Sequence, residues 1–298
     1  MQLCGINETK MKKEISFTAR GRRADIGELT IYRILPNRYA NAVGPFVFLD
    51  HIAPKMNTIT KKGGMGAHPH RGIATLTYIL NGEGEHFDSA GNNAKIHSGG
   101  VQWMKAGNGI IHDESLNYDT NTNSKLTHSF QFWINLPSQI KKEKPEYLAI
   151  EGNEVPQKNL ANKSGWIKVI VGNYEELQSR IPNYSEQFLF HIHLEPGKDF
   201  SITIKDKMEV AAFLPTENVT INNTESDAGE FVEFDRNVGE IEFRNCLHTA
   251  TDIILFGGET YAEPIVAEGP FVLNSNAEIA EAYRDFHSGK YGTITYKN

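Results

Sequence analysis

Residues 68–86 read HPHRGIATLTYILNGEGEH, and this stretch decides the fold class. Its central part, ATLTYIL at residues 74–80, separates two sets of side chains: Leu76, Tyr78 and Leu80 on one face, and Thr75, Thr77 and Ile79 on the other. A period of two is typical of a β-strand, because successive side chains of a strand point to opposite faces. The NGEGE segment that follows is typical of a tight turn. We therefore predict a strand that ends in a turn.

The chain on either side of this strand contains further short, β-rich apolar runs. Gly, Asn or Asp residues separate these runs between about residue 15 and residue 136. They read LTIYRILP, FVFLDHI, VQWMKAG and SFQFWINLP. Many short strands with frequent turns favour an antiparallel sandwich or barrel.

A change in composition divides the chain into two parts. Residues 138–163 are polar and interrupted, so we expect a linker there, between a domain at 12–137 and a domain at 164–298. The second domain repeats the order of short strands, from WIKVIVG to TDIILFGG. It ends in a predicted helix at 276–287, with Ser275 and Glu278 as a capping box and Gly289 at its C-terminus. We expect this helix to dock on a barrel.

The overall composition is that of an ordinary globular protein. The chain has 298 residues and a formal net charge of −7, which disfavours direct binding to nucleic acid. The two cysteines lie far apart and form no CxxC pair, so we expect neither a disulfide framework nor a zinc–cysteine site. No segment approaches the ~20 apolar residues of a membrane span, and no secretory signal is evident. We expect a cytoplasmic monomer.

Two short motifs carry the chemistry. His68 and His70 lie two residues apart, as do His112 and Glu114 in GNGIIHDES at residues 107–115. In extended chain, residues i and i+2 point to the same face, so each pair can hold one ion, while Asp113 points the other way. Three imidazoles and one carboxylate suit Fe, Mn, Ni, Cu or Zn. We predict one transition-metal site, formed where two strands of a barrel bring the pairs together.

The sequence does not determine the coordination geometry of the metal at this site. Four protein ligands around an octahedral ion would leave two positions for substrate and dioxygen. A closed tetrahedral set would instead be structural.

The run HPHRGIATLTYILNGEGEHFDSAGNNAKIHSGGVQWMKAGNGIIHDES resembles the metal-binding half of the pirin family, within the cupin superfamily. Further matches are PFVFLDHIAP near residues 45–54, FQFWINLP at 130–137 and EGPFVLNSNAEI near the end. The resemblance covers nearly the whole chain.

This resemblance implies an all-β bicupin, in which two jelly-roll (double-stranded β-helix) barrels are stacked, with a short C-terminal helix. It implies one iron ion in the N-terminal barrel, held by His68, His70, His112 and Glu114. It implies no metal in the C-terminal barrel, where FSITIKDKMEVAAFLPTE contains no histidine. His191 and His193 form an HxH pair there, but no second ligand pair follows them.

The resemblance also implies a function. Some pirin-like proteins look like quercetin 2,3-dioxygenases, which open the central ring of a flavonol with dioxygen and release carbon monoxide. In that interpretation a metal-bound hydroxyl is acidified and Glu114 is the catalytic base. The substrates would be a flavonol-like aromatic molecule and dioxygen. The alternative is a non-enzymatic, iron-dependent redox-sensing protein or transcriptional co-regulator that binds a protein partner.

One position departs from the family pattern. Pirins often have an acidic residue in HPHRGxE, whereas Ala74 occupies this position here. If that carboxylate accepts the proton in some members, this chain must use Glu114 or a metal-bound hydroxide instead.

Several flanking residues are candidates for the surroundings of the site. The candidate apolar walls of a pocket for a flat substrate are Phe46, Phe48, Met65, Trp103, Phe130 and Phe132. Asp50 and His51 are candidates to orient a metal ligand by hydrogen bonding. Arg71 is expected to point away from the ion and to form an ion pair. His86, His97 and His128 have no partner at ligand spacing.

Overall fold

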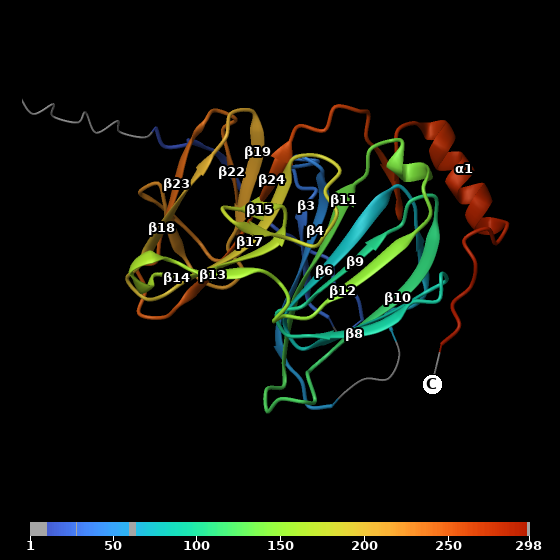
Figure 1. The fold of residues 1–298 in the computed structure, drawn as a ribbon, viewed down its shortest axis with the longest axis horizontal. Helices are drawn as coiled ribbons and strands as arrows, with labels where there is room; N and C mark the ends of the chain where they lie inside the picture. The colour runs from blue at the N-terminus through green and yellow to red at the C-terminus, as the bar shows by residue number, and fades with distance from the viewer. Residues whose placement is uncertain (1–10, 28, 60–63, 297–298) are drawn as a thin grey trace, which may run out of the picture.

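A computed structural model describes residues 11–27, 29–59 and 64–296 of the chain. Figure 1 shows two β-barrels side by side, with a single α-helix, α1 (Asn276–His287), in the described residues. The predicted all-β fold of two barrels with one C-terminal helix is thereby confirmed.

The N-terminal barrel consists of two antiparallel sheets. The larger has the order β12-β9-β6-β11-β4-β3-β2 and the smaller β5-β10-β7-β8. The bounds in the larger sheet are β12 (Glu146–Ile150), β9 (Val101–Lys105), β6 (Ile73–Asn81), β11 (Leu126–Asn135), β4 (Phe46–Met56), β3 (Ile31–Leu35) and β2 (Arg22–Arg23). Those in the smaller sheet are β5 (His68–His70), β10 (Ile110–Asn117), β7 (Glu83–Asp88) and β8 (Asn93–His97).

The C-terminal barrel repeats this plan. Its larger sheet comprises β1 (Ile15–Arg20), β22 (Glu230–Phe234), β19 (Met208–Phe213), β24 (Thr251–Glu259), β17 (Gln187–Leu194), β14 (Gly165–Val171) and β13 (Gln157–Asn159). Its smaller sheet comprises β18 (Asp199–Ile204), β23 (Gly239–Arg244), β20 (Val219–Ile221) and β21 (Thr224–Ser226). Two hairpins are β15 (Asn173–Tyr174) with β16 (Leu177–Gln178), and β25 (Val266–Glu268) with β26 (Phe271–Leu273); single 3₁₀ turns are η1 (Ile140–Lys142) and η2 (Ala161–Lys163).

The largest hydrophobic core lies between the two barrels. Phe46 and Phe132 of the N-terminal barrel meet Phe256 of the C-terminal barrel, with ring centroids 5.3–5.9 Å apart. Leu76 and Tyr78 of β6 belong to the same core. The other face of β6 carries Thr77, whose hydroxyl donates to the Glu114 carboxylate. The C-terminal barrel, in contrast, is filled by apolar side chains from both of its sheets.

Each terminal segment of the chain packs on the barrel that is built mainly from the other half of the sequence. We expected residues 15–20 in the N-terminal domain, but β1 pairs with β22 of the C-terminal sheet. Conversely, α1 and the β25–β26 hairpin pack on the N-terminal barrel, where Arg71 forms ion pairs with Glu281 and Asp285 of α1. The ion pair expected for Arg71 is thus confirmed. Figure 1 shows α1 at the outer end of this barrel, far from β18 and β23.

The segment expected to be a linker also contributes strands. Within residues 138–163, β12 pairs with β9 of the N-terminal barrel and β13 with β14 of the C-terminal barrel. The many charged residues around EYLAI at 146–150 concealed a strand at the edge of a sheet, where charged side chains are common.

The C-terminal helix begins and ends as the sequence predicts. The Ser275 hydroxyl accepts a hydrogen bond from the backbone N–H of Glu278, and Gly289 has a positive φ of 79° after the last turn. Gly72, just after β5, allows the β25–β26 hairpin to approach the chain closely at this point. Its φ is 85°, and a Cβ at this position would lie 2.0 Å from the carbonyl oxygen of Val272.

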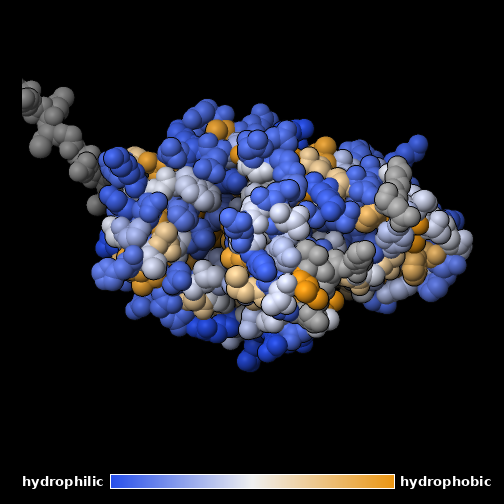
Figure 2. Space-filling view, turned by 90° about the horizontal axis from the view of Figure 1, so that it is seen from below, coloured by the Kyte–Doolittle hydropathy of each residue, from blue (hydrophilic) through white to orange (hydrophobic). Residues whose placement is uncertain are grey.

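One face of the molecule is mainly polar. On the face shown in Figure 2, hydrophilic residues predominate and apolar residues are scattered among them. Met56, Ile59 and Met65 are among the exposed large apolar side chains. Within the described residues, α1 is the longest helix and falls short of the length and apolar character required to cross a bilayer.

Two histidines are buried together beside the core between the barrels. The Nε2 atoms of His51 and His128 lie 2.8 Å apart, and both rings contact Phe130. Burial lowers the pKa of His51 to about 3 and that of His128 to about 4. Both imidazoles are therefore neutral in the folded protein above that range, whereas in the unfolded chain they protonate near pH 6.5.

We expect acid to destabilise the fold through this pair. As the pH falls below about 6.5, the unfolded chain takes up protons that the folded chain does not, so each histidine removes about 2 kcal/mol by pH 5. Urea unfolding at about pH 7.5 and about pH 5 measures this loss. His128→Gln should lose about 2 kcal/mol less than wild type over the interval, and exposed His248→Gln should match wild type. Equal losses for His128→Gln and wild type would contradict the assignment.

Candidate metal centre

Three of the predicted ligands converge in the N-terminal barrel. His68 and His70 lie on β5, and β10 pairs with β5 so that His112 is directly opposite His68. The Nε2 atoms of His68 and His112 are 2.9 Å apart. One nitrogen of each of the three rings lies within 4.8 Å of the others. The two motifs therefore meet as neighbouring strands of one sheet, rather than across the barrel.

Hydrogen bonds fix how two of these rings face the centre. Nδ1 of His68 donates to the carbonyl oxygen of Gly66 at 2.8 Å, and Nδ1 of His70 donates to that of Pro270 at 3.0 Å. A carbonyl oxygen only accepts, so Nδ1 carries a hydrogen, and in the neutral ring Nε2 then keeps its lone pair. Carbonyl groups orient metal-binding histidines in the same way.

The site also keeps two of its imidazoles neutral. Burial lowers the pKa of His70 to about 3, and burial together with the neighbouring His70 and His68 lowers the pKa of His112 well below its ordinary value. The Nδ1 atom of His112 is buried and has no hydrogen-bond partner among the described residues. Closely spaced, neutral imidazole nitrogens fit a transition-metal ion.

Glu114 lies beside this group rather than in it. Its carboxylate forms a separate group with His86 and His112, and its Oε2 is 4.0 Å from Nδ1 of His112. Its Oε1 accepts a hydrogen bond from the Thr77 hydroxyl at 2.8 Å. The structure thus brings His68, His70 and His112 together. Glu114 is buried, with 6% of its surface exposed, and it adjoins this group through His112.

His86 is a member of this site that sequence reasoning missed. It lies on β7 directly opposite Glu114, and its ring stacks on Tyr147 at 4.2 Å. The expectation of no partner at ligand spacing is wrong for His86 and His97, because each belongs to a group of possible metal ligands, whereas His128 belongs to no such group among the described residues. Spacing along one strand does not reveal partners that strand pairing supplies. Asp113 does point away from the site, where it accepts hydrogen bonds from the Gly66 N–H and the Tyr296 hydroxyl.

Thr77 links Glu114 to Gln131. The Thr77 hydroxyl lies 2.6 Å from the Gln131 side-chain oxygen and 2.8 Å from the Glu114 oxygen. A hydroxyl has one hydrogen to donate. It donates to Glu114 when the amide group of Gln131 turns its nitrogen toward the threonine oxygen. The two side chains can therefore hold the carboxylate in one position.

A pocket of about 1010 Å³ opens onto His68, His70 and Glu114. Phe48 and Trp133 line it with rings stacked 4.1 Å apart and 9° from parallel. The β25–β26 hairpin contributes residues such as Pro270 and Val272. The lining is largely apolar, as in most small-molecule sites.

Only part of the predicted pocket wall is correct. Phe48 and Met65 line the pocket, whereas Phe46, Trp103, Phe130 and Phe132 lie in the core between the barrels. Alternation along β11 explains the difference, because Gln131 and Trp133 point inward while their neighbours point to the other barrel. Polar Gln131 beside Trp133 was the available signal for the inward face.

Asp50 and His51 do not orient the histidines. Asp50 forms an ion pair with Arg33 at the pocket wall, and the Arg33 guanidinium lies 4.0 Å from the Phe48 ring centroid. His51 faces His128 as described above. Ala74, at the position that departs from the family pattern, belongs to the core between the barrels and is 1% exposed.

The HxH pair of the C-terminal barrel has other partners. His191 and His193 both contact the same Asp252 oxygen, at 2.9 and 2.7 Å, and the Tyr78 hydroxyl lies 2.7 Å from Nδ1 of His191. This network stabilises the Asp252 carboxylate, so its pKa lies well below the usual range. The pair is part of a hydrogen-bond network between the barrels.

Two antiparallel barrels with a histidine-lined pocket in the first define a bicupin. The chain belongs to the pirin family: the Pirin family model matches residues 28–134, and that of the pirin C-terminal cupin domain matches residues 189–292.

Relatives from distant organisms support this assignment. A pirin-like protein of Caulobacter vibrioides is 32% identical over 90% of this chain and 92% of its own length. Human pirin is 30% identical over 78% of this chain and 79% of its own length. The crystal structure of a quercetin 2,3-dioxygenase from Acinetobacter baumannii matches with a TM-score of 0.87 and 28% identity, covering 95% of this chain and all of that one.

Proposed function

We propose that this protein is a metal-dependent dioxygenase that acts on a flavonol-like aromatic substrate, as a quercetin 2,3-dioxygenase does. One observation carries the proposal: three imidazoles present closely spaced ring nitrogens at an apolar pocket of about 1010 Å³. The similarity to the Acinetobacter baumannii enzyme supports it.

His68, His70 and His112 would hold the metal through Nε2, with Glu114 as an adjacent carboxylate ligand or base. Iron is the proposed metal, and Mn, Ni, Cu and Zn suit the same donor atoms. When bound, such an ion makes a coordinated hydroxyl group more acidic and holds it beside dioxygen.

The protein's own residues would position the substrate and move one proton. The stacked Phe48 and Trp133 rings offer an apolar wall to a flat aromatic molecule, which excludes water from one side. Glu114 would accept the hydroxyl proton, since its carboxylate lines the pocket. Thr77 and Gln131 would keep that carboxylate in place, because the Thr77 hydroxyl lies 2.8 Å from Glu114 and Gln131 lies 2.6 Å from the same hydroxyl.

We expect the purified protein to contain metal and to consume quercetin in air. Loss of the flavonol absorbance and release of carbon monoxide measure the reaction directly, and elemental analysis measures the metal. Bound iron without turnover of quercetin would overturn the dioxygenase proposal for that substrate and would favour a non-enzymatic role. The metal-free protein is the control.

Thr77→Val should lower kcat by about 10–100-fold while metal content stays constant. The change removes one hydrogen bond to a charged group, which contributes about 1.5–3 kcal/mol. Thr75→Val is the matched control, because Thr75 is buried on the same face of β6 but has no hydrogen bond to Glu114 among the described residues. An equal loss in both variants would show that Thr77 does not position Glu114.

A further inference from the structure

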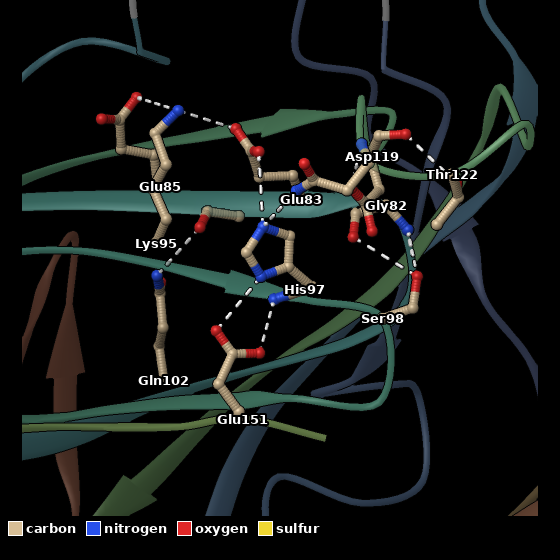
Figure 3. Close-up of polar contacts among 12 residues, drawn as sticks. Gly82, Glu83, Glu85, Lys95, His97, Ser98, Gln102, Asp119, Thr122 and Glu151 are labelled. Carbon is tan, nitrogen blue, oxygen red and sulfur yellow. Dashed lines mark hydrogen bonds and ion pairs between the residues drawn. The ribbon is translucent and has the colours of Figure 1, made fainter. Parts of the chain in front are cut away.

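A second group of metal-ligating side chains lies at the β7–β8 hairpin. Glu83 is on β7, His97 is on β8 and Asp119 follows β10, and one ligand atom of each lies within 4.8 Å of the others. Figure 3 shows the Glu83 carboxylate directed toward one nitrogen of His97 and the Glu151 carboxylate toward the other. None of these residues belongs to the three-histidine centre.

Glu151 orients the His97 ring. Nδ1 of His97 donates to Oε1 of Glu151 at 3.1 Å, and the backbone N–H of His97 donates to Oε2 at 3.3 Å. A carboxylate that binds Nδ1–H in this way leaves Nε2 with a lone pair, which is how carboxylates orient histidines that bind metals. That nitrogen lies 3.6 Å from Oε2 of Glu83. The Asn121 side-chain nitrogen lies 3.3 Å from the same Nε2 and can donate to its lone pair, and a bound cation would take the place of that hydrogen bond.

Asp119 gives an independent indication of a cation. The residue is only 5% exposed, and its carboxylate accepts one hydrogen bond, from the backbone N–H of Asn121 to Oδ1 at 2.8 Å. Its other oxygen accepts none from residues 11–27, 29–59 or 64–296, but it is not among the fully enclosed polar atoms that lack a partner, so it retains contact with solvent, from which a cation can reach it. A buried carboxylate is unfavourable unless it is paired or coordinates a metal.

The nearby positive charge is already engaged. Lys95 contacts Glu83 at 2.9 Å and Glu85 at 4.0 Å, and no ion pair joins a Lys or Arg to Asp119 in the part of the chain that the structure describes. Carboxylates therefore outnumber ammonium groups around His97. The remaining negative charge favours a cation at the point where the Glu83, His97 and Asp119 ligand atoms meet.

We propose that Glu83, His97 and Asp119 bind a divalent transition-metal ion at a site distinct from the three-histidine centre. One imidazole nitrogen and two carboxylates suit Zn²⁺ or Mn²⁺ better than Ca²⁺ or Mg²⁺, which prefer all-oxygen sites. Glu151 is a positioning residue that fixes the tautomer of His97. The ion would fasten the segment between β10 and β11 to the β7–β8 hairpin. This inference does not depend on the proposed dioxygenase function.

Zn²⁺ titration of the metal-free full-length chain tests the site. Calorimetry, with elemental analysis after dialysis, should give two equivalents for wild type and one each for His97→Ala and His112→Ala. Asp119→Asn should also lose one equivalent while it keeps an oxygen for the Asn121 N–H. Glu151→Gln should weaken one of the two equivalents by about 10–100-fold, because it removes only the orienting carboxylate.

Exposed His248→Ala is the control and should bind two equivalents, as wild type does. One equivalent in wild type that His97→Ala retains would overturn the second site. Two equivalents in both His97→Ala and Asp119→Asn would also overturn it. A loss in His97→Ala alone, with Glu151→Gln and Asp119→Asn unchanged, would overturn the proposed ligand set. Failure of the three-histidine centre would appear separately, as unchanged binding in His112→Ala.

Discussion

His112→Ala should lose its metal at the three-histidine centre, with affinity reduced by more than about 100-fold. Loss of a group that merely orients a metal ligand lowers affinity about 10–100-fold, and removal of a ligand should lower it further. His112 is completely buried, and its Nε2 is 2.9 Å from that of His68, so its truncation removes one of the three imidazoles of the centre. Turnover of quercetin should disappear with the metal.

His193→Ala is the matched control for this prediction. It also removes one histidine of an HxH or HxE motif, but from the C-terminal barrel, where His193 contacts Asp252. This variant should retain the metal and the activity. Elemental analysis of both proteins, with circular dichroism to verify folding, measures the difference. Equal loss of metal in both would contradict the placement of the centre in the N-terminal barrel.

Phe132→Ala should destabilise the whole protein by about 3–5 kcal/mol, the usual result of truncating a fully buried phenylalanine. Its ring is 0% exposed and packs edge to face against Phe46 and Phe256. Because these three rings join the two barrels, we expect a single cooperative transition at lower denaturant concentration. Chemical denaturation followed by tryptophan fluorescence gives the free energy of unfolding.

Tyr39→Ala is the control for Phe132→Ala. Tyr39 is 60% exposed, so its truncation should change the free energy of unfolding by no more than about 0.5 kcal/mol. If Phe132→Ala instead produced two separate transitions, with the C-terminal barrel as stable as before, the barrels would be independent. The aromatic core between them would then contribute little to the stability of either one.

The strands of the fold could be predicted because their sequence pattern is local. The alternation at residues 74–80 places Leu76 and Tyr78 on one face and Thr77 on the other, and the structure agrees. The assignment of β1 to the second barrel could not be predicted. Its six residues alternate between more and less exposed positions along the strand, and this pattern would suit an edge of either sheet.

The candidate site, like the fold, could be predicted from the sequence only in part. His68 and His70 share a face because a strand has a period of two, and the sequence shows that directly. The position of Glu114 beside the three histidines depends on a hydrogen bond from Thr77, and the presence of His86 depends on the register between β7 and β10. Both follow from contacts between segments that are distant in the sequence.

The β25–β26 hairpin determines when the three-histidine centre can be completed during synthesis. The carbonyl oxygen of Pro270 accepts the hydrogen bond that orients His70, and neighbouring residues complete the pocket wall. During synthesis the last of the three histidines, His112, leaves the ribosome 158 residues before Pro270 does. A nascent chain can therefore form the strands of the N-terminal barrel, but the three-histidine centre is completed only after residue 270 has emerged. Metal loading should consequently be a late, largely post-translational event.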